Sequence, residues 1–154
     1  MTPHSRKLPP TKLSSAQRCD KVSGFLKAQA GWLSGEANRT AGFDSSKVLL
    51  KKRDGSVKRS EAPSRFNIWA RRRHERRAER YVDSLTRPLK DLISAGLGNP
   101  AFQRAAREFL AFTGEHQKPN GYRHLAHTMP LEARLKALHV ALAASAQHLY
   151  DKQG

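Results

Sequence analysis

Apolar residues recur at helical spacing in the first third of the chain. They fall on one face of a helix, with Trp32 at its edge, and are Val22, Phe25, Leu26 and Leu33. Ser14 or Ser15 stands where an N-cap is expected, so we predict a helix from there to about Leu33. Glycines favour a loop after it: Gly31, Gly35 and Gly42. The pattern predicts a flexible tail over residues 1–13, and a helix with a glycine-rich connector over residues 14–45.

The same 3.6-residue period returns after Tyr81. Its apolar positions are Val82, Leu85, Leu89, Leu92 and Ile93. Pro88 lies inside this run. Because proline lacks a backbone N–H and clashes with the preceding turn, we expect the helix to break or kink near Arg87, with Pro88 opening a second short helix.

Two further helices are delimited by their ends. Gly96 and Gly98 are typical of a C-terminal stop, and Asn99 with Pro100 supplies an N-cap and a first helical residue. A strongly apolar helix ended by Gly114 is expected from there. After a polar loop, the last helix is expected to begin at residues 128–130.

The leucines of this last helix step by four, three, four and seven residues, at Leu131, Leu135, Leu138, Leu142 and Leu149. The spacing predicts a heptad seam that continues through Ser145. It fits either the amphipathic closing helix of a bundle or a homodimer seam between two copies of the helix from Leu131 to Leu149. Residues 88–154 are therefore expected to form a helical bundle, with dimerisation as the second interpretation.

Residues 46–60 have the signature of a β-hairpin. Asp54 and Gly55 supply the positive φ that a tight turn needs. The stretch carries six basic residues. Because an isolated two-stranded hairpin is only marginally stable in water, we expect this one to pack on another element or to act as a basic flap.

These elements together predict a mainly α fold. A small helical bundle over residues 82–150 is preceded by a long basic helix over residues 64–87, a short β-hairpin and a flexible N-terminal tail. Ser64 is the expected N-cap of the basic helix. At 154 residues the chain suits one domain, or a small domain with tails.

Positive charge is concentrated ahead of the bundle. The formal net charge is +16, and residues 47–80 carry 13 basic and 4 acidic side chains. Seven of the seventeen residues from Arg65 to Tyr81 are arginine, and Ala78 is the only apolar residue between Ala70 and Tyr81. Such a helix is cationic on every side, so we expect it to lie in water or against a polyanion.

The choice of arginine over lysine favours nucleic acid as this polyanion. A guanidinium group presents a planar fork to phosphate oxygens and guanine edges, and it stacks on bases. Trp69 and Tyr81 bracket the arginines, and stacking on unpaired bases is expected from one or the other of these rings.

Other chemistry finds little support in the chain. Cys19 is the only cysteine, which excludes an internal disulfide and makes a reducing compartment the default. His116, His124 and His127 lack the carboxylates or thiolates that complete a metal site. No apolar run approaches the length of a membrane span. We expect a non-enzymatic cytoplasmic or nucleoid- or nucleus-associated protein with no cofactor and no metal.

Residues 71–80 resemble the arginine-rich RNA-binding peptide of the lambdoid-phage N antitermination proteins. One branch of that family is similar at Arg72, Arg73, His74, Glu75, Arg76 and Arg77, and another at Arg76, Arg77, Ala78 and Glu79. The resemblance covers about a dozen residues. It implies a helix that binds the major groove of a small RNA hairpin and serves transcription regulation.

The sequence therefore predicts a nucleic-acid-binding regulatory protein, most consistent with structured RNA. One alternative is a DNA-binding accessory protein of a phage or plasmid type, dimeric through its last helix. The other is a structural or host-interacting protein that binds an acidic protein surface. The expected contact residues are Lys51, Lys52, Arg53, Lys58, Arg59, Arg65, Trp69, Arg71, Arg72, Arg73, Arg76, Arg77, Arg80 and Tyr81.

Overall fold

The computed structural model describes residues 13–39, 47–61, 63–64, 66–116 and 128–153. Its elements, in chain order, are α1 (Ser15–Arg39), β1 (Lys47–Lys51), β2 (Val57–Glu61), α2 (Ile68–Ser94), α3 (Pro100–His116) and α4 (Thr128–Gln153). The expected mainly α fold with a short antiparallel hairpin is confirmed. The predicted tail lies outside the described residues except for Leu13.

Helix α1 begins at a reciprocal capping box. Ser14 Oγ accepts from the Gln17 amide at 3.2 Å, and Gln17 Oε1 accepts from the Ser14 amide at 2.9 Å. The helix runs through Gly31 and Gly35 to Arg39. The predicted end near Leu33 is therefore wrong. Glycine is only slightly less favourable than other residues inside a helix, and packing against another helix outweighs this small cost.

That other helix is α4, and α1 with α4 forms the most extensive contact of the fold. The leucines of the heptad seam supply the buried side of α4, with Leu131, Leu135, Leu138 and Leu142 at most 2% exposed. Ser23 Oγ and His139 Nδ1 lie 2.7 Å apart across this interface. The seam is thus used within the chain. The bundle predicted for residues 82–150 is incomplete, because it omitted α1.

Helix α2 continues unbroken through Pro88 to Ser94. Of the two alternatives predicted near Arg87, the break is wrong, and the boundary at residue 88 is wrong with it. Tyr81 and Leu85 before the proline and Leu89 and Leu92 after it are all buried in one core, and this burial outweighs the hydrogen bond that Pro88 cannot make. The helix also starts later than expected, with Asn67 as its N-cap, whose Oδ1 accepts from the Ala70 amide.

The start of α3 follows the prediction. Asn99 Oδ1 accepts from the Phe102 amide at 2.7 Å, and Pro100 is the first helical residue. Gly98 has a φ of 87°, and a Cβ there would lie 2.4 Å from the Phe102 ring. The helix passes the expected stop at Gly114 and ends at His116. The Ser145 hydroxyl on α4 accepts from the Asn99 amide and so ties this turn to the bundle.

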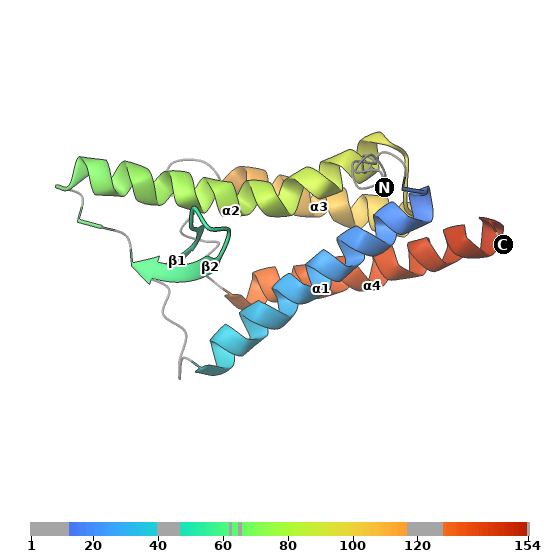
Figure 1. Cartoon of the computed structure of the whole chain (residues 1–154), viewed down its shortest axis with the longest axis horizontal. Coiled ribbons are helices and arrows are strands. Elements are labelled where there is room, and N and C mark those ends of the chain that lie inside the picture. Colours follow the sequence, from blue (N-terminus) through green and yellow to red (C-terminus); the bar gives the residue numbers. More distant parts are fainter. Residues whose placement is uncertain (1–12, 40–46, 62, 65, 117–127, 154) are drawn as a thin grey trace, which may run out of the picture.

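The hairpin forms as predicted and packs on α2. Its strands pair antiparallel, with Leu50 opposite Lys58, and Gly55 in the turn has a φ of 90°. Leu49 joins the main core, while Leu50 forms a separate small cluster with Ala78. Figure 1 shows the hairpin beneath the N-terminal part of α2, and α1 crossing α4 beneath the C-terminal part of the same helix. One long helix therefore has its ends in different surroundings.

Candidate nucleic-acid interface

Exposed arginines gather on one side of α2. At 100° per residue, Trp69 and four arginines fall within an arc of about 100° centred opposite Ala78. These arginines are Arg72, Arg73, Arg76 and Arg80, and all four side chains are exposed. We call these five residues the arginine face. Glu79 lies at its edge, and a hollow of about 280 Å³ beside Trp69 is lined by Arg72, Glu75, Arg76 and Glu79.

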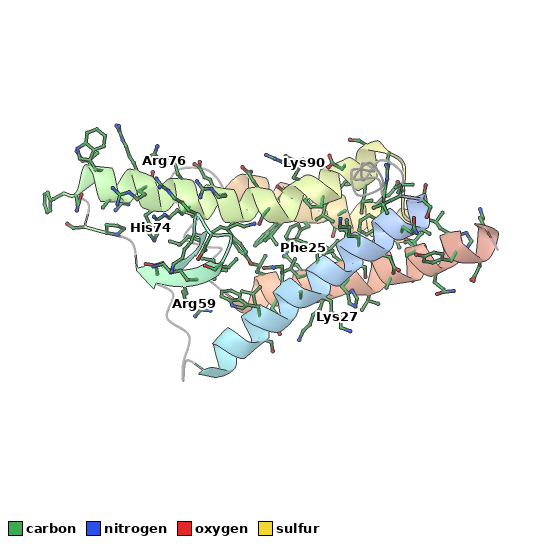
Figure 2. The ribbon with its side chains drawn as sticks, in the orientation of Figure 1. Phe25, Lys27, Arg59, His74, Arg76 and Lys90 are labelled. Atoms are coloured by element: carbon green, nitrogen blue, oxygen red, sulfur yellow. The ribbon has the colours of Figure 1, made fainter. Side chains whose placement is uncertain are left out.

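The opposite side of the same helix is covered by the hairpin. Ala78 is 2% exposed against Leu50, and His74 is 6% exposed. Figure 2 shows His74 on the side of α2 toward the hairpin, and Arg76 on the other side. The expectation that this helix is cationic on every side is therefore wrong. Ala78 and His74 are enough to form a buried contact with the hairpin. Of the two interpretations of the hairpin, packing on another element is therefore the one that the structure has.

Burial under the hairpin changes the pKa of His74. Desolvation lowers the pKa of His74. A hydrogen bond to the backbone of Ser60 and the charge of Glu75 oppose this, while Arg71 and Arg77 add to it. Arg71 is half-buried, and its Nε lies 3.5 Å from Glu75 Oε1. On the helix, Arg77 borders the arginine face, whereas Arg71 lies close to Ala78 on the opposite side, so neither is part of the exposed arc.

The two aromatic residues that bracket the arginines have opposite surroundings. Trp69 is 75% exposed at the end of the arginine face. Tyr81 is 1% exposed in the core, where its hydroxyl donates to Gln29 Oε1 of α1 at 3.4 Å, and burial raises the pKa of this phenol. The prediction that Tyr81 stacks on bases is wrong, because no base can reach its ring.

The hairpin cations do not join the arginine face, because the hairpin lies under the opposite side of α2. Lys52, Arg53 and Lys58 are exposed there. The guanidinium nitrogens of Arg59 are shielded from solvent, so its expected role as a surface contact is also wrong. Lys51 is half-buried and, like Arg80, lines a pocket between α1 and α2. Arg65 lies outside the described residues.

Two cations that extend the arginine face were missed by the sequence reasoning. Arg87 and Lys90 are exposed further along α2, and Figure 2 shows Lys90 on the same side as Arg76. From Trp69 to Arg87 the strip is about 27 Å long at 1.5 Å per residue. Residues 69, 73, 76, 80 and 87 are spaced so that they lie on one side of a continuous helix, and this spacing could have identified Arg87. It was not used, because the helix was expected to be interrupted near Arg87.

Two candidate nucleophiles in the described part of the chain, Ser23 and Cys19, are buried. Ser23 and His139 have the contact distance of a nucleophile and its base, but Ser23 is 3% exposed. Burial raises the pKa of the Cys19 thiol, and Asp20 raises it further, which is the opposite of activation. Within the described ranges, no three metal-ligating side chains come together. His124 and His127 lie outside those ranges.

Comparison with protein-family models finds no match, and comparisons with curated proteins and with solved structures find none either. None of the described helices is long and apolar enough to cross a membrane. The candidate site therefore stands on its own geometry.

Proposed function

We propose that the protein is a non-enzymatic regulator that binds structured RNA through the arginine face. The observation that carries the proposal is the exposure of Arg72, Arg73, Arg76 and Arg80 on one side of a helix whose other side is packed. Four guanidinium groups in one arc repel each other in the free protein, and a polyanion relieves this repulsion. The protein would then act in the cytoplasm, or with nucleic acid at a nucleoid or nucleus, in transcription regulation.

Trp69 favours RNA over duplex DNA as the partner. Its ring is 75% exposed at the end of the arginine face. A stacking aromatic residue needs an unpaired base, which a hairpin loop offers and a regular duplex does not. The resemblance of residues 71–80 to arginine-rich RNA-binding peptides supports the same partner.

Support for the DNA alternative is weaker than the sequence indicated. A dimer through α4 would have suited the two-fold symmetry of DNA half-sites. The leucines of that seam are buried within the chain, with Leu135 and Leu142 at 0% exposure. Duplex DNA and an acidic protein surface therefore remain the two alternative partners, and the experiment below is designed to detect either of them.

The test is a salt titration of affinity for an RNA hairpin and a DNA duplex of equal charge, followed through the fluorescence of Trp69. A Trp32→Phe background removes the only other tryptophan. If four to six cations engage phosphates, log affinity for the duplex should fall with log salt at a slope of roughly −4 to −5. We expect the hairpin to be preferred, and this preference to persist near physiological salt.

Matched variants locate the interaction. Changing Arg72, Arg76 and Arg80 together to Ala should reduce the salt slope by about 3, since each phosphate contact contributes about 1. The control removes the same charge elsewhere, by changing the exposed Arg104, Arg107 and Lys152 to Ala. Equal losses for both triple variants would mean that only net charge matters. Duplex-favoured binding would indicate the DNA alternative, and no binding of either probe would leave the acidic protein partner.

A further inference from the structure

A pocket of about 710 Å³ opens between α1 and α2, beyond the arginine face. Its apolar lining residues are all aliphatic, with Leu13 and Val22 from the α1 side and Pro88 and Leu92 from α2. We call these four residues the floor of the pocket and its charged lining residues the rim. The volume lies within the range of about 300–1,000 Å³ that is typical of small-molecule sites. Because α2 passes unbroken through Pro88, the lining residues before and after the proline form one continuous wall.

The rim of this pocket is strongly basic. Three elements contribute its cations, which are Arg18, Lys21, Lys51, Arg80 and Arg87. Asp83 and Asp91 are the acidic lining residues, so the described lining carries a net charge of +3. An aliphatic floor below a cationic rim complements a molecule that has an apolar body and a negative head.

Other occupants fit these walls less well. Among the described lining residues none is aromatic, so a nucleobase would find no ring to stack on and would depend on arginine side chains alone. Residues 1–12 carry Arg6, Lys7 and Lys12 and no acidic residue, so their charge has the same sign as the rim. A second copy of the chain brings its own net charge of +16. A small organic anion is the occupant that the charges favour.

We propose that this pocket binds a small organic anion with an aliphatic body, of the fatty-acid type, with its carboxylate held by the basic rim. Arg80 belongs both to the arginine face and to the rim, and Arg87 extends the face and lines the pocket. The ligand therefore competes with nucleic acid for these two cations. This regulatory consequence rests on the proposed function, whereas the binding site itself does not.

Isothermal titration calorimetry with decanoate below its micelle concentration tests the site directly. Decyltrimethylammonium has the same chain with a cationic head, and acetate has the head without the chain. We expect one saturable site for decanoate and none for either control. Lys21→Glu should weaken decanoate at least about tenfold, because a charge-assisted contact is worth about 1.5–3 kcal/mol. Ser84→Phe, which fills one wall of the pocket, should abolish binding while circular dichroism shows an intact fold.

Several results would overturn the proposal. Equal binding of decanoate and decyltrimethylammonium would mean that the rim does not select charge. Unchanged decanoate affinity in Ser84→Phe would place the binding elsewhere. Displacement of decanoate by adenosine or uridine monophosphate at lower concentration would make the pocket a nucleotide site. Binding to phosphatidylglycerol vesicles without binding to free decanoate would indicate a membrane surface.

Three variants separate the pocket from the RNA site. Arg72→Ala should weaken only the RNA hairpin, Lys21→Glu only decanoate, and Arg87→Ala both. Decanoate should lower the affinity of the wild type for the hairpin. If decanoate binds and no nucleic acid does, the proposed function fails and the pocket stands. If the hairpin binds equally well with and without saturating decanoate, the competition is wrong.

Discussion

Trp69 and Tyr81 show how burial decides the role of a side chain. Both aromatic residues border the same run of arginines, and sequence alone gives them the same role. On a helix they lie about 120° apart, because twelve residues make three and one third turns. This rotation places Tyr81 in the core and leaves Trp69 in solvent.

Substitution by alanine should therefore separate binding from stability at these two residues. Trp69→Ala should change the unfolding free energy by no more than about 0.5 kcal/mol, as is usual for exposed sites. Its binding free energy for the RNA hairpin should weaken by about 1–3 kcal/mol, the typical contribution of one stacked base.

Tyr81→Ala should instead lower the unfolding free energy by about 3–5 kcal/mol, since it leaves a cavity in the core. Urea unfolding and hairpin titrations on both variants check the pair. A large loss of stability in Trp69→Ala would mean that its ring packs on the protein.

At the scale of elements, His74 links α2 to the hairpin, and its burial makes this contact depend on pH. Because the pKa of His74 is lowered in the folded state, the unfolded chain binds more protons below about pH 6.5, the usual value for histidine. Stability is therefore complete above that pH. It is lost as the pH falls through 6.5 toward the folded-state pKa.

The expected outcome is a smaller pH dependence in His74→Leu than in the wild type. Unfolding free energies from urea titrations at pH 7.5 and 5.5 measure it, and the difference between the two pH values is compared. His148→Gln, which changes an exposed histidine on α4, serves as the control and should keep the wild-type difference. An identical pH dependence in His74→Leu would show that the hairpin contact does not titrate.

The helix ends that sequence predicts best are those set by local chemistry. Asn99 caps α3 with its own side chain, and Pro100 fixes the φ of the first helical residue. The positive φ of Gly55 forms the hairpin turn in the same local way, and all three were predicted correctly. Gly35 and Pro88 are also local signals for a helix end, yet α1 and α2 continue through them. At Pro88 the decisive term is the burial of residues on both sides of it in the main core, which a single sequence does not reveal.

The same limit applies to the candidate site. Its arginines and Trp69 were recognisable from composition and spacing, because an exposed charged surface needs no knowledge of the core. Which side of α2 is free depends on the packing of Leu50 against Ala78, a contact between two elements. The pocket requires α1 and α2 to lie opposite each other, and no motif in the sequence encodes that.

At the scale of the whole molecule, the α1–α4 interface holds the bundle together. Leu138 is 2% exposed in this interface, so Leu138→Ala should cost about 2–5 kcal/mol of unfolding free energy. Val140, two residues along the same helix, is 66% exposed. Val140→Ala should therefore change stability by less than about 0.5 kcal/mol.

Urea unfolding measures both variants, and sedimentation equilibrium checks their mass. Since the leucine seam is used within the chain, Leu138→Ala should have the same oligomeric state as the wild type. A wild-type dimer that dissociates in Leu138→Ala without loss of secondary structure would support the dimer interpretation of the seam.

Because burial is uneven along α2, its two halves should differ in how readily they unfold locally. Its C-terminal half is anchored in the main core by residues such as Tyr81 and Leu89, whereas its N-terminal half is held by the small contact of Ala78 and His74 with the hairpin. Backbone amides near the N-terminus can then exchange with solvent by local fraying, while those near Leu89 exchange only through unfolding of the bundle. The part of the helix that carries the arginines can thus reshape itself around a partner and leave the bundle undisturbed.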